Sequence, residues 1–203
     1  MLLDYFPMHT RFIRILLMLI LFVPLQTEAQ TNRKIGLYTG AGTERLSDKL
    51  DLGFDYQYRV HFFQFEYSHT IISLHKTHLE GHFTPQFNTT RYRNLDGADY
   101  FQTSYEAGLN ISLAVRQEII TNNFSVYIML GTGPHYIFGS PDRQISGFIF
   151  SDNLFIGAQV RVWEKLWLDI RPGFRHISNA ETRHPNLGIN SFNINFGFFL
   201  EIE

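Results

Sequence analysis

The sequence contains no cysteine, which excludes disulfide bonds and metal sites with thiolate ligands. Beyond the N-terminal segment it also lacks the run of roughly 20 apolar residues that a membrane-spanning helix needs. Charged side chains are few and nearly balanced, with a formal net charge of -2, so no nucleic-acid partner is indicated. The chain is instead rich in aromatic side chains, with 20 Phe and 10 Tyr, and this composition favours strands over helices.

The N-terminus has the layout of a secretory signal peptide. Arg11 and Arg14 precede a short apolar run, residues 15–23, and small residues follow it. The run is too short to cross a bilayer as a helix, although a retained N-terminal anchor is the alternative. We therefore expect a cleaved signal peptide, residues 1–29, followed by a single exported domain, residues 30–203.

Period-two alternation of apolar and polar residues runs through the exported domain. In residues 101–116 the odd positions are apolar and the even positions are polar or small. Such runs are long enough to cross a bilayer when tilted, as the strands of outer-membrane barrels do. The alternation in residues 51–69 changes phase at Phe62 and Phe63, which indicates a bulge or a hidden turn. The eight candidate strands are residues 34–42, 51–69, 71–84, 101–116, 124–136, 154–162, 166–171 and 191–202.

An even number of strands places both chain ends on the same, periplasmic side. The connections then fall into two groups, short turns at the periplasmic rim and longer loops outside, as is typical of outer-membrane barrels. We predict an all-β fold, an eight-stranded antiparallel transmembrane β-barrel of the outer-membrane type. The expected periplasmic turns are residues 117–123 and 163–165, and the expected outer loops are residues 84–99, 140–146 and 179–189.

A secreted lipocalin-like barrel is a second interpretation of the same alternation. Its apolar face points inward around a ligand and its polar face points into water, so alternation alone does not separate the two folds. Charged and amide side chains on the polar faces favour the membrane barrel, because they can pair inside a narrow lumen. These side chains are Glu106, Arg116, Gln159, Arg161, Asp169 and Arg171.

Three polar side chains near the C-terminus share the parity of the apolar face. His176 and Ser178 continue the even-numbered apolar series of their strand, and Asn190 begins that of the last strand. Polar groups on a lipid-facing surface cost free energy when they lack partners. A histidine with a serine two residues further on can act as base and nucleophile, with a third polar group fixing the imidazole tautomer. Wet interface residues at a barrel rim are the simpler explanation.

The segment from His176 to Ser191 resembles the active-site region of the outer-membrane lipid A 3-O-deacylases, the PagL-like barrels. The signature of that family is His-x-Ser-Asn-Ala, then Pro-Asn, then Gly-Ile and an acidic residue. This sequence matches it without insertion or gap at His176, Ser178, Asn179, Ala180, Pro185, Asn186, Gly188 and Ile189.

The resemblance implies an enzyme of the Gram-negative outer membrane that removes the 3-O-linked acyl chain from lipid A, the membrane anchor of lipopolysaccharide. No metal or organic cofactor is expected. Ser178 would be the nucleophile and His176 the base, and the side chain of Asn179 with a backbone N–H near Glu181 would hold the oxyanion. Around this site Arg175, Arg183, His184 and Asn186 would contact the substrate, since guanidinium groups suit lipid A phosphates. Solvated charges at the rim are the alternative interpretation of Arg175, Arg183 and His184.

Two positions depart from the family pattern. Asn190 stands where the best-known members have Glu, and Glu181 where they have Gly. An amide can orient a histidine, as in Cys-His-Asn proteases, but it cannot offset the charge of an imidazolium. The alternatives are a less active enzyme in which Asn190 orients His176, an enzyme in which Glu181 substitutes for the missing acid, and a non-catalytic barrel. That barrel would serve as a scaffold or as an adhesion surface through residues 84–99. The sequence does not specify an oligomeric state.

Two other patterns resemble functional motifs. Of His75, His78 and His82, only the last two share a strand face, so we interpret the group as part of a wet outer rim and not as a metal site. The glycine-rich segment 131–134 lacks the Lys-Ser/Thr end of a phosphate-binding loop, and it predicts a strand kink.

Overall fold

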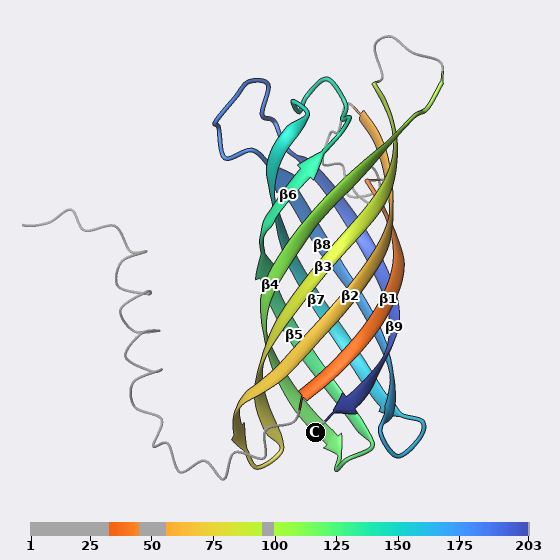
Figure 1. The fold of residues 1–203 in the computed structure, drawn as a ribbon, viewed down its shortest axis with the longest axis vertical. Coiled ribbons are helices and arrows are strands. Elements are labelled where there is room, and N and C mark those ends of the chain that lie inside the picture. Colours follow the sequence, from red (N-terminus) through yellow and green to blue (C-terminus); the bar gives the residue numbers. More distant parts are fainter. Residues whose placement is uncertain (1–32, 45–55, 95–99, 203) are drawn as a thin grey trace, which may run out of the picture.

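The computed structural model describes residues 33–44, 56–94 and 100–202, and the expected signal peptide lies outside these ranges. Among the described residues no helix is long and apolar enough to cross a membrane. Regular structure in this part of the chain consists of antiparallel strands (Figure 1). They are β1 (Arg33–Thr43), β2 (Tyr56–Leu74), β3 (Thr77–Asn94), β4 (Gln102–Ile120), β5 (Phe124–Thr132), β6 (Pro134–Ile137), β7 (Gly147–Arg161), β8 (Leu166–Ser178) and β9 (Ile189–Ile202).

The strands close into a barrel. Their order is β3-β2-β1-β9-β8-β7-β5-β4, and pairing of β3 with β4 completes the ring. Strand β6 continues β5, because both pair with β4 on one side and β7 on the other. The break between them lies at Gly133, where any side chain would collide with the carbonyl oxygen of Leu109. The ring therefore has eight members, and both the predicted barrel and the predicted kink are confirmed.

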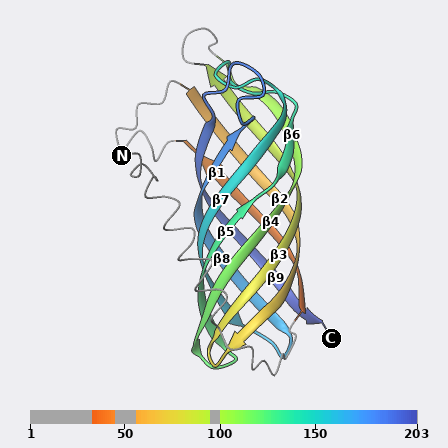
Figure 2. The same ribbon diagram turned by 90° about the vertical axis from the view of Figure 1, so that its left-hand side faces the viewer.

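The two ends of the barrel differ. At one end, here named the turn end, Arg33 pairs with Ile202 and short turns join β2 to β3, β4 to β5 and β7 to β8. At the other end, named the loop end, longer connections join β1 to β2, β3 to β4, β6 to β7 and β8 to β9 (Figures 1 and 2). The predicted division into short turns and longer loops is confirmed.

Apolar side chains cover the outside of the barrel, whereas polar ones fill the inside. On β4, Leu113 and Val115 point outward and are about half exposed, whereas Ser112 and Arg116 are buried in the lumen. A belt of exposed Phe, Leu, Ile and Val would be unfavourable in water and is the lipid-facing surface of a membrane barrel. This distribution excludes the lipocalin-like alternative, whose apolar face points inward.

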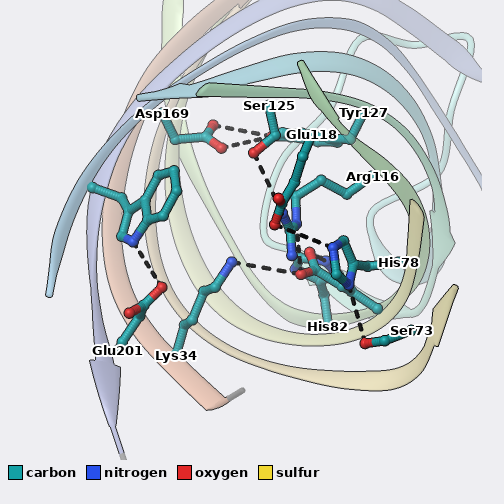
Figure 3. Close-up of polar contacts among 12 residues, drawn as sticks. Lys34, Ser73, His78, His82, Arg116, Glu118, Ser125, Tyr127, Asp169 and Glu201 are labelled. Carbon is teal, nitrogen blue, oxygen red and sulfur yellow. Dashed lines mark hydrogen bonds and ion pairs between the residues drawn. The ribbon is translucent and has the colours of Figure 1, made fainter. Parts of the chain in front are cut away.

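Charged groups in the lumen are paired with one another (Figure 3). Near the turn end, Glu80 accepts from Arg116 at 2.8 Å and lies 3.5 Å from the Lys34 ammonium. Further along the axis Arg171 pairs with Glu66 at 2.8 Å. Each buried charge needs such a partner, because removing one member would leave the other unpaired in a medium of low dielectric constant. The expectation that charges on the polar faces pair inside the barrel is confirmed for Arg116 and Arg171.

Three expectations about the N-terminal half are wrong. The division expected between strands 51–69 and 71–84 is displaced, because β2 runs on to Leu74 and the turn lies at residues 75–76. Alternation runs unbroken through Phe62, which is buried, and Phe63, which is exposed, and the irregularity lies instead between Thr70 and Ile72. The polar stretch assigned to the outer loop 84–99 is strand up to Asn94. Its even-numbered polar residues face the lumen, so a polar interior surface was mistaken for a loop.

The three clustered histidines are not at an outer rim. His75 lies in the turn between β2 and β3 at the turn end, and His78 contacts Ser73 and Glu118 beside it. His82 is buried in the lumen, with Nδ1 3.0 Å from a carboxylate oxygen of Glu66. Within the described ranges, no three His, Cys, Asp or Glu side chains gather as a metal site.

Candidate active site

The alternation of inward and outward side chains at the C-terminal end of β8 places two candidate residues on the outer surface near the loop end. Ile177 is only 1% exposed and points into the lumen, so His176 and Ser178 on either side of it point outward, where both are half-buried. This is the side that the parity of the sequence predicts. An imidazole and a hydroxyl therefore share one face of the strand, at the edge of the apolar belt.

His176 is oriented by a residue of the neighbouring strand. It lies directly opposite Asn190 of β9, and its Nδ1 is 2.7 Å from the amide oxygen Oδ1. Because an amide oxygen only accepts, Nδ1 must carry the proton, which leaves Nε2 of the neutral ring with a free lone pair. That tautomer is the one a general base needs.

Two further contacts hold this pair in place. The backbone N–H of Asn190 donates to the hydroxyl of Tyr56 at 2.8 Å, and that hydroxyl lies 3.3 Å from the Asn190 carbonyl oxygen. Gly188 has φ of +68°, and a Cβ there would lie 2.5 Å from Cε1 of His176. The glycine of the signature is thus required both by its backbone conformation and by the space that the imidazole occupies.

Ser178 ends β8 and is not bonded to His176 in this structure. Among the described residues, neither the Ser178 hydroxyl nor Nε2 of His176 has a hydrogen-bond partner. Their Cα atoms are two strand residues apart, about 6.5 Å. A rotation of the serine side chain toward the ring brings the two groups closer, and such catalytic bonds commonly form only when substrate is bound.

The loop after Ser178 is fixed by Asn179, which is fully buried. Its backbone N–H donates to the side chain of Asn186 at 2.9 Å, and its amide donates to the carbonyl of Arg183 at 2.7 Å. The Asn179 side-chain amide therefore donates its hydrogen bond within the loop. This geometry does not support its predicted role in holding the oxyanion. The Asn186 side chain likewise stabilises the loop, because its oxygen accepts the hydrogen bond from the Asn179 backbone, and its predicted role as a substrate contact has no support here.

Backbone donors remain available next to Ser178. Ala180 and Glu181 both have positive φ, 52° and 61°. In the described part of the chain no acceptor bonds to the N–H of either residue. Oxyanion holes are commonly formed by backbone N–H groups that lie close to the nucleophile.

The register adds an acidic residue that the sequence analysis missed. Asp152 of β7 lies directly opposite His176, on the side away from Asn190, and it is exposed on the outer surface. Its carboxylate accepts a 2.5 Å hydrogen bond from Thr132 at the end of β5. The polar row thus runs across four strands in the order Thr132, Asp152, His176, Asn190. Asp152 breaks the even-numbered apolar series of β7, which is the signal that could have identified it.

An apolar groove of about 840 Å³ passes this row, with Pro134 and Phe150 on the loop-end side and Leu154 and Phe174 on the turn-end side. It extends over the outer surface of β4, β5, β7 and β8 toward the turn end, next to the break in the strand at Gly133. Except for the polar row, outward side chains that line it are apolar, and they include Leu113, Leu130, Pro134, Leu154 and Phe174. The groove has the shape and polarity to take an alkyl chain whose polar end lies at His176.

One family model and several solved structures resemble most of the chain. The family model described as lipid A 3-O-deacylase (PagL) matches residues 50–199, most of the chain. The chain belongs to the PagL family. A crystal structure of the outer membrane enzyme PagL shares 15% identity, with a TM-score of 0.58 over 81% of this chain and 97% of that one. No curated protein sequence matches.

Two further barrels are more distant from this PagL-family chain. Neisserial surface protein A is 12% identical, with a TM-score of 0.38 over 85% of this chain and 96% of that one. The outer membrane protein OprG from Pseudomonas aeruginosa is 11% identical, with a TM-score of 0.42 over the same shares of the two chains.

Among the residues expected to contact substrate in this PagL-family barrel, Arg175 is a clear error. It is 1% exposed, points into the lumen and pairs with Glu106 at 2.7 Å. Its odd number gives it the parity of the polar face, which places it in the lumen and away from the substrate. Arg183 and His184 are exposed in the loop, and Arg183 donates to the carbonyl of Ser146 at 3.0 Å, which ties two outer loops together.

The two residues that depart from the family signature, Asn190 and Glu181, differ in their position relative to His176. Asn190 occupies the orienting position beside His176, as its place in the signature implies. Glu181 is exposed in the loop, and among the described residues its carboxylate makes no hydrogen bond or ion pair. The substitution of Glu181 for the missing acid therefore has no support in the contacts, whereas Asp152 lies directly opposite His176.

Proposed function

We propose that this barrel is a serine esterase that hydrolyses the 3-O-linked acyl chain of lipid A in the outer leaflet of a Gram-negative outer membrane, after export on a cleaved signal peptide. The observation that carries the proposal is the hydrogen bond between His176 and Asn190 on the outward surface. It fixes the imidazole as a base two residues from the Ser178 hydroxyl and beside an apolar groove.

The difference between the two ends of the barrel supports this location. Bacterial outer-membrane barrels turn their short connections and their chain ends to the periplasm and their longer loops outward. The loop end would then face the cell exterior, and His176 would lie at the level of the outer leaflet. Lipid A is the glycolipid of that leaflet, so its ester bonds would reach the polar row from within the membrane.

The reaction proceeds through an acyl-enzyme. The Ser178 oxygen attacks the ester carbonyl carbon while its proton passes to Nε2 of His176. Collapse of the intermediate breaks the bond to the sugar 3-oxygen, which takes the proton from His176. A water molecule then gives its proton to His176 and attacks the acyl-Ser178, releasing the fatty acid and restoring the hydroxyl.

The free N–H groups of Ala180 and Glu181 would stabilise the oxyanion in both steps. Preorganised donors of this kind are worth about 3–4 kcal/mol each in the transition state. Their strand-end position beside Ser178 supports this role better than the buried amide of Asn179.

Asp152 would supply the negative charge that Asn190 lacks. Side chains directly opposite on antiparallel strands have Cβ atoms about 5 Å apart. Among the described residues Asp152 and His176 form no ion pair, but rotation of their side chains can bring the charges to about 5 Å. At that separation they attract by about 3 kcal/mol at an effective dielectric constant of 20, and by less where water reaches them. In this mechanism Asn190 orients the imidazole ring, and Asp152 stabilises its protonated form.

The test is mass spectrometry of lipid A from cells that express the chain. Wild type should produce lipid A lighter by one 3-O-linked acyl chain, and Ser178→Ala should leave it intact. Thr121→Ala, which removes an exposed hydroxyl at the turn end, is the control and should behave as wild type. An equal acyl pattern for Ser178→Ala and wild type, with both barrels present in the outer membrane, would refute the proposal.

A further inference from the structure

Three arginines gather on the outer surface near the loop end. The guanidinium carbons of Arg59, Arg91 and Arg93 lie 4.8, 5.4 and 5.5 Å from the ring centre of Phe101. Arg59 comes from β2 and the other two from β3, and all three have the odd-numbered parity that faces outward on those strands. We call this group the arginine cluster.

Within the described ranges, no group around the cluster balances its charge. Arg59 lies directly opposite Arg91, and like charges in that relation destabilise a sheet. Among the described residues no carboxylate pairs with any of the three, and Nε of Arg93 is buried without a hydrogen-bond partner. The face of Phe101 offsets part of the repulsion by cation–π contact. An anion bound between the guanidinium groups would remove the rest.

An aromatic surface lies below the cluster, beyond one mixed row. Moving toward the turn end, the first outward row holds His61 of β2, Thr89 of β3 and Tyr105 of β4, and the second holds Phe63 and Phe87. The three aromatic side chains are each about half exposed. The rings of Phe87 and Tyr105 stack at 5.7 Å. A surface that is cationic at the rim and aromatic beneath it matches a lipid with a phosphate headgroup and acyl chains.

This surface is separate from the candidate active site. In the ring of eight, β3 lies four positions from β8 in either direction, so the arginine cluster and His176 are on opposite sides of the barrel. A single lipid bound at His176 cannot reach around to Arg91. Any lipid at the arginine cluster is a second molecule.

We propose that the arginine cluster binds a phosphate group of a second lipid A molecule, whose acyl chains lie along Phe63, Phe87 and Tyr105, and that this molecule is held without being hydrolysed. The site requires the barrel to stand in a leaflet that contains lipid A, but it does not require Ser178 to be a nucleophile. Guanidinium forks bind phosphate oxygens in pairs, which suits a group presented at the membrane surface.

The experiment uses the full chain as Ser178→Ala, reconstituted in phosphatidylcholine nanodiscs, with bound lipid counted by native mass spectrometry. Purified lipid A is compared with the same lipid A after its phosphates have been removed. Variant Arg59→Gln/Arg91→Gln is compared with Arg33→Gln, which removes an exposed arginine at the turn end. Inorganic phosphate is titrated separately, to distinguish a free anion from a lipid headgroup.

The expected result is that the double variant binds phosphorylated lipid A at least about tenfold more weakly, whereas Arg33→Gln does not change. Removing the phosphates should weaken binding to the unsubstituted cluster by a similar factor, a measurement that does not depend on any variant folding. Deacylation by Arg59→Gln/Arg91→Gln in the chain with Ser178 intact should continue at the normal rate, so failure of this site and failure of the esterase proposal are distinguishable.

Three outcomes would overturn the proposal. They are equal binding of both lipids, unchanged binding by the double variant, and binding of inorganic phosphate as tight as that of lipid A. A double variant that loses thermal stability without any change in lipid A binding would instead show that the cluster is balanced within the protein.

Discussion

The imidazole of His176 and the amide of Asn190 face each other across β8 and β9, with Nδ1 2.7 Å from Oδ1. This contact gives the base its tautomer without giving it a charged partner. In serine hydrolases the third residue does both, and replacing its carboxylate by an amide can lower kcat by as much as about 10⁴-fold when the amide imposes the wrong tautomer. Here the amide oxygen faces the ring, so the tautomer is correct and only the charge is missing.

Asn190→Glu should therefore raise the deacylation rate. A carboxylate at this position accepts the same hydrogen bond and also stabilises the imidazolium, and we expect a gain in kcat of about tenfold or more. The measurement is single-turnover release of fatty acid from lipid A in detergent micelles. A rate that does not change, in a variant that folds normally, would mean that Asn190 does not act on the base.

Asp152→Asn should lower kcat by about tenfold and change KM much less, because it removes charge beside His176 while keeping size and hydrogen bonding. Thr132→Val is the matched control, since it removes the hydroxyl that bonds to Asp152 but leaves the carboxylate. If Asp152 compensates for Asn190, its substitution should matter little in an Asn190→Glu background. Equal losses in both backgrounds would contradict that coupling.

Gly188→Ala should damage the site more than the fold. Positive φ costs a non-glycine residue about 1–2 kcal/mol, and the new Cβ would displace His176 from Asn190. We expect deacylation to fall at least about 100-fold, while the melting temperature changes by a few degrees. Gly81→Ala is the control, because its Cβ would meet only the flexible end of Ile71 at 3.2 Å. Normal activity in Gly188→Ala would rule out the packing argument.

Leu154→Trp should change the choice of acyl chain. Leu154 lines the groove below the polar row and is 40% exposed, so an indole there would fill part of the 840 Å³. The expected outcome is a lower kcat/KM for long acyl chains with little change for short ones, measured on synthetic esters of graded length. Ile156→Trp, one outward position further along β7 and absent from the groove lining, serves as control. A uniform loss at every chain length would show that the groove does not hold the acyl chain.

Parity alone predicts much of this molecule. It gives the number of barrel strands, the turns after β4 and β7 and the outward placement of His176 and Ser178, because a period of two leaves each strand only two choices of face. The parity of Arg175 also predicts its position, because its odd number places it in the lumen, where it pairs with Glu106. Arg175 is next to His176 in the sequence, but the two side chains point to opposite faces of β8, so proximity in the sequence does not indicate a contact with the same substrate.

Other features depend on register and on loops, which one sequence does not specify. Asp152 meets His176 only because β7 and β8 pair in a particular alignment. Asn179 is buried, and its hydrogen bonds to Asn186 and Arg183 lie within its own loop. The polar stretch before Asn94 was assigned to a loop because a hydrophilic lumen and bulk water select the same residue types.

The central claim is that His176 makes Ser178 a nucleophile, and covalent labelling tests it most directly. The folded protein is incubated with a long-chain phosphonate ester that reacts with activated serines, and the adduct is located by peptide mass spectrometry. One adduct per chain is expected, on Ser178, formed by wild type and by Asn190→Glu and lost in His176→Ala. No adduct on Ser178, or an equal adduct in His176→Ala, would contradict it.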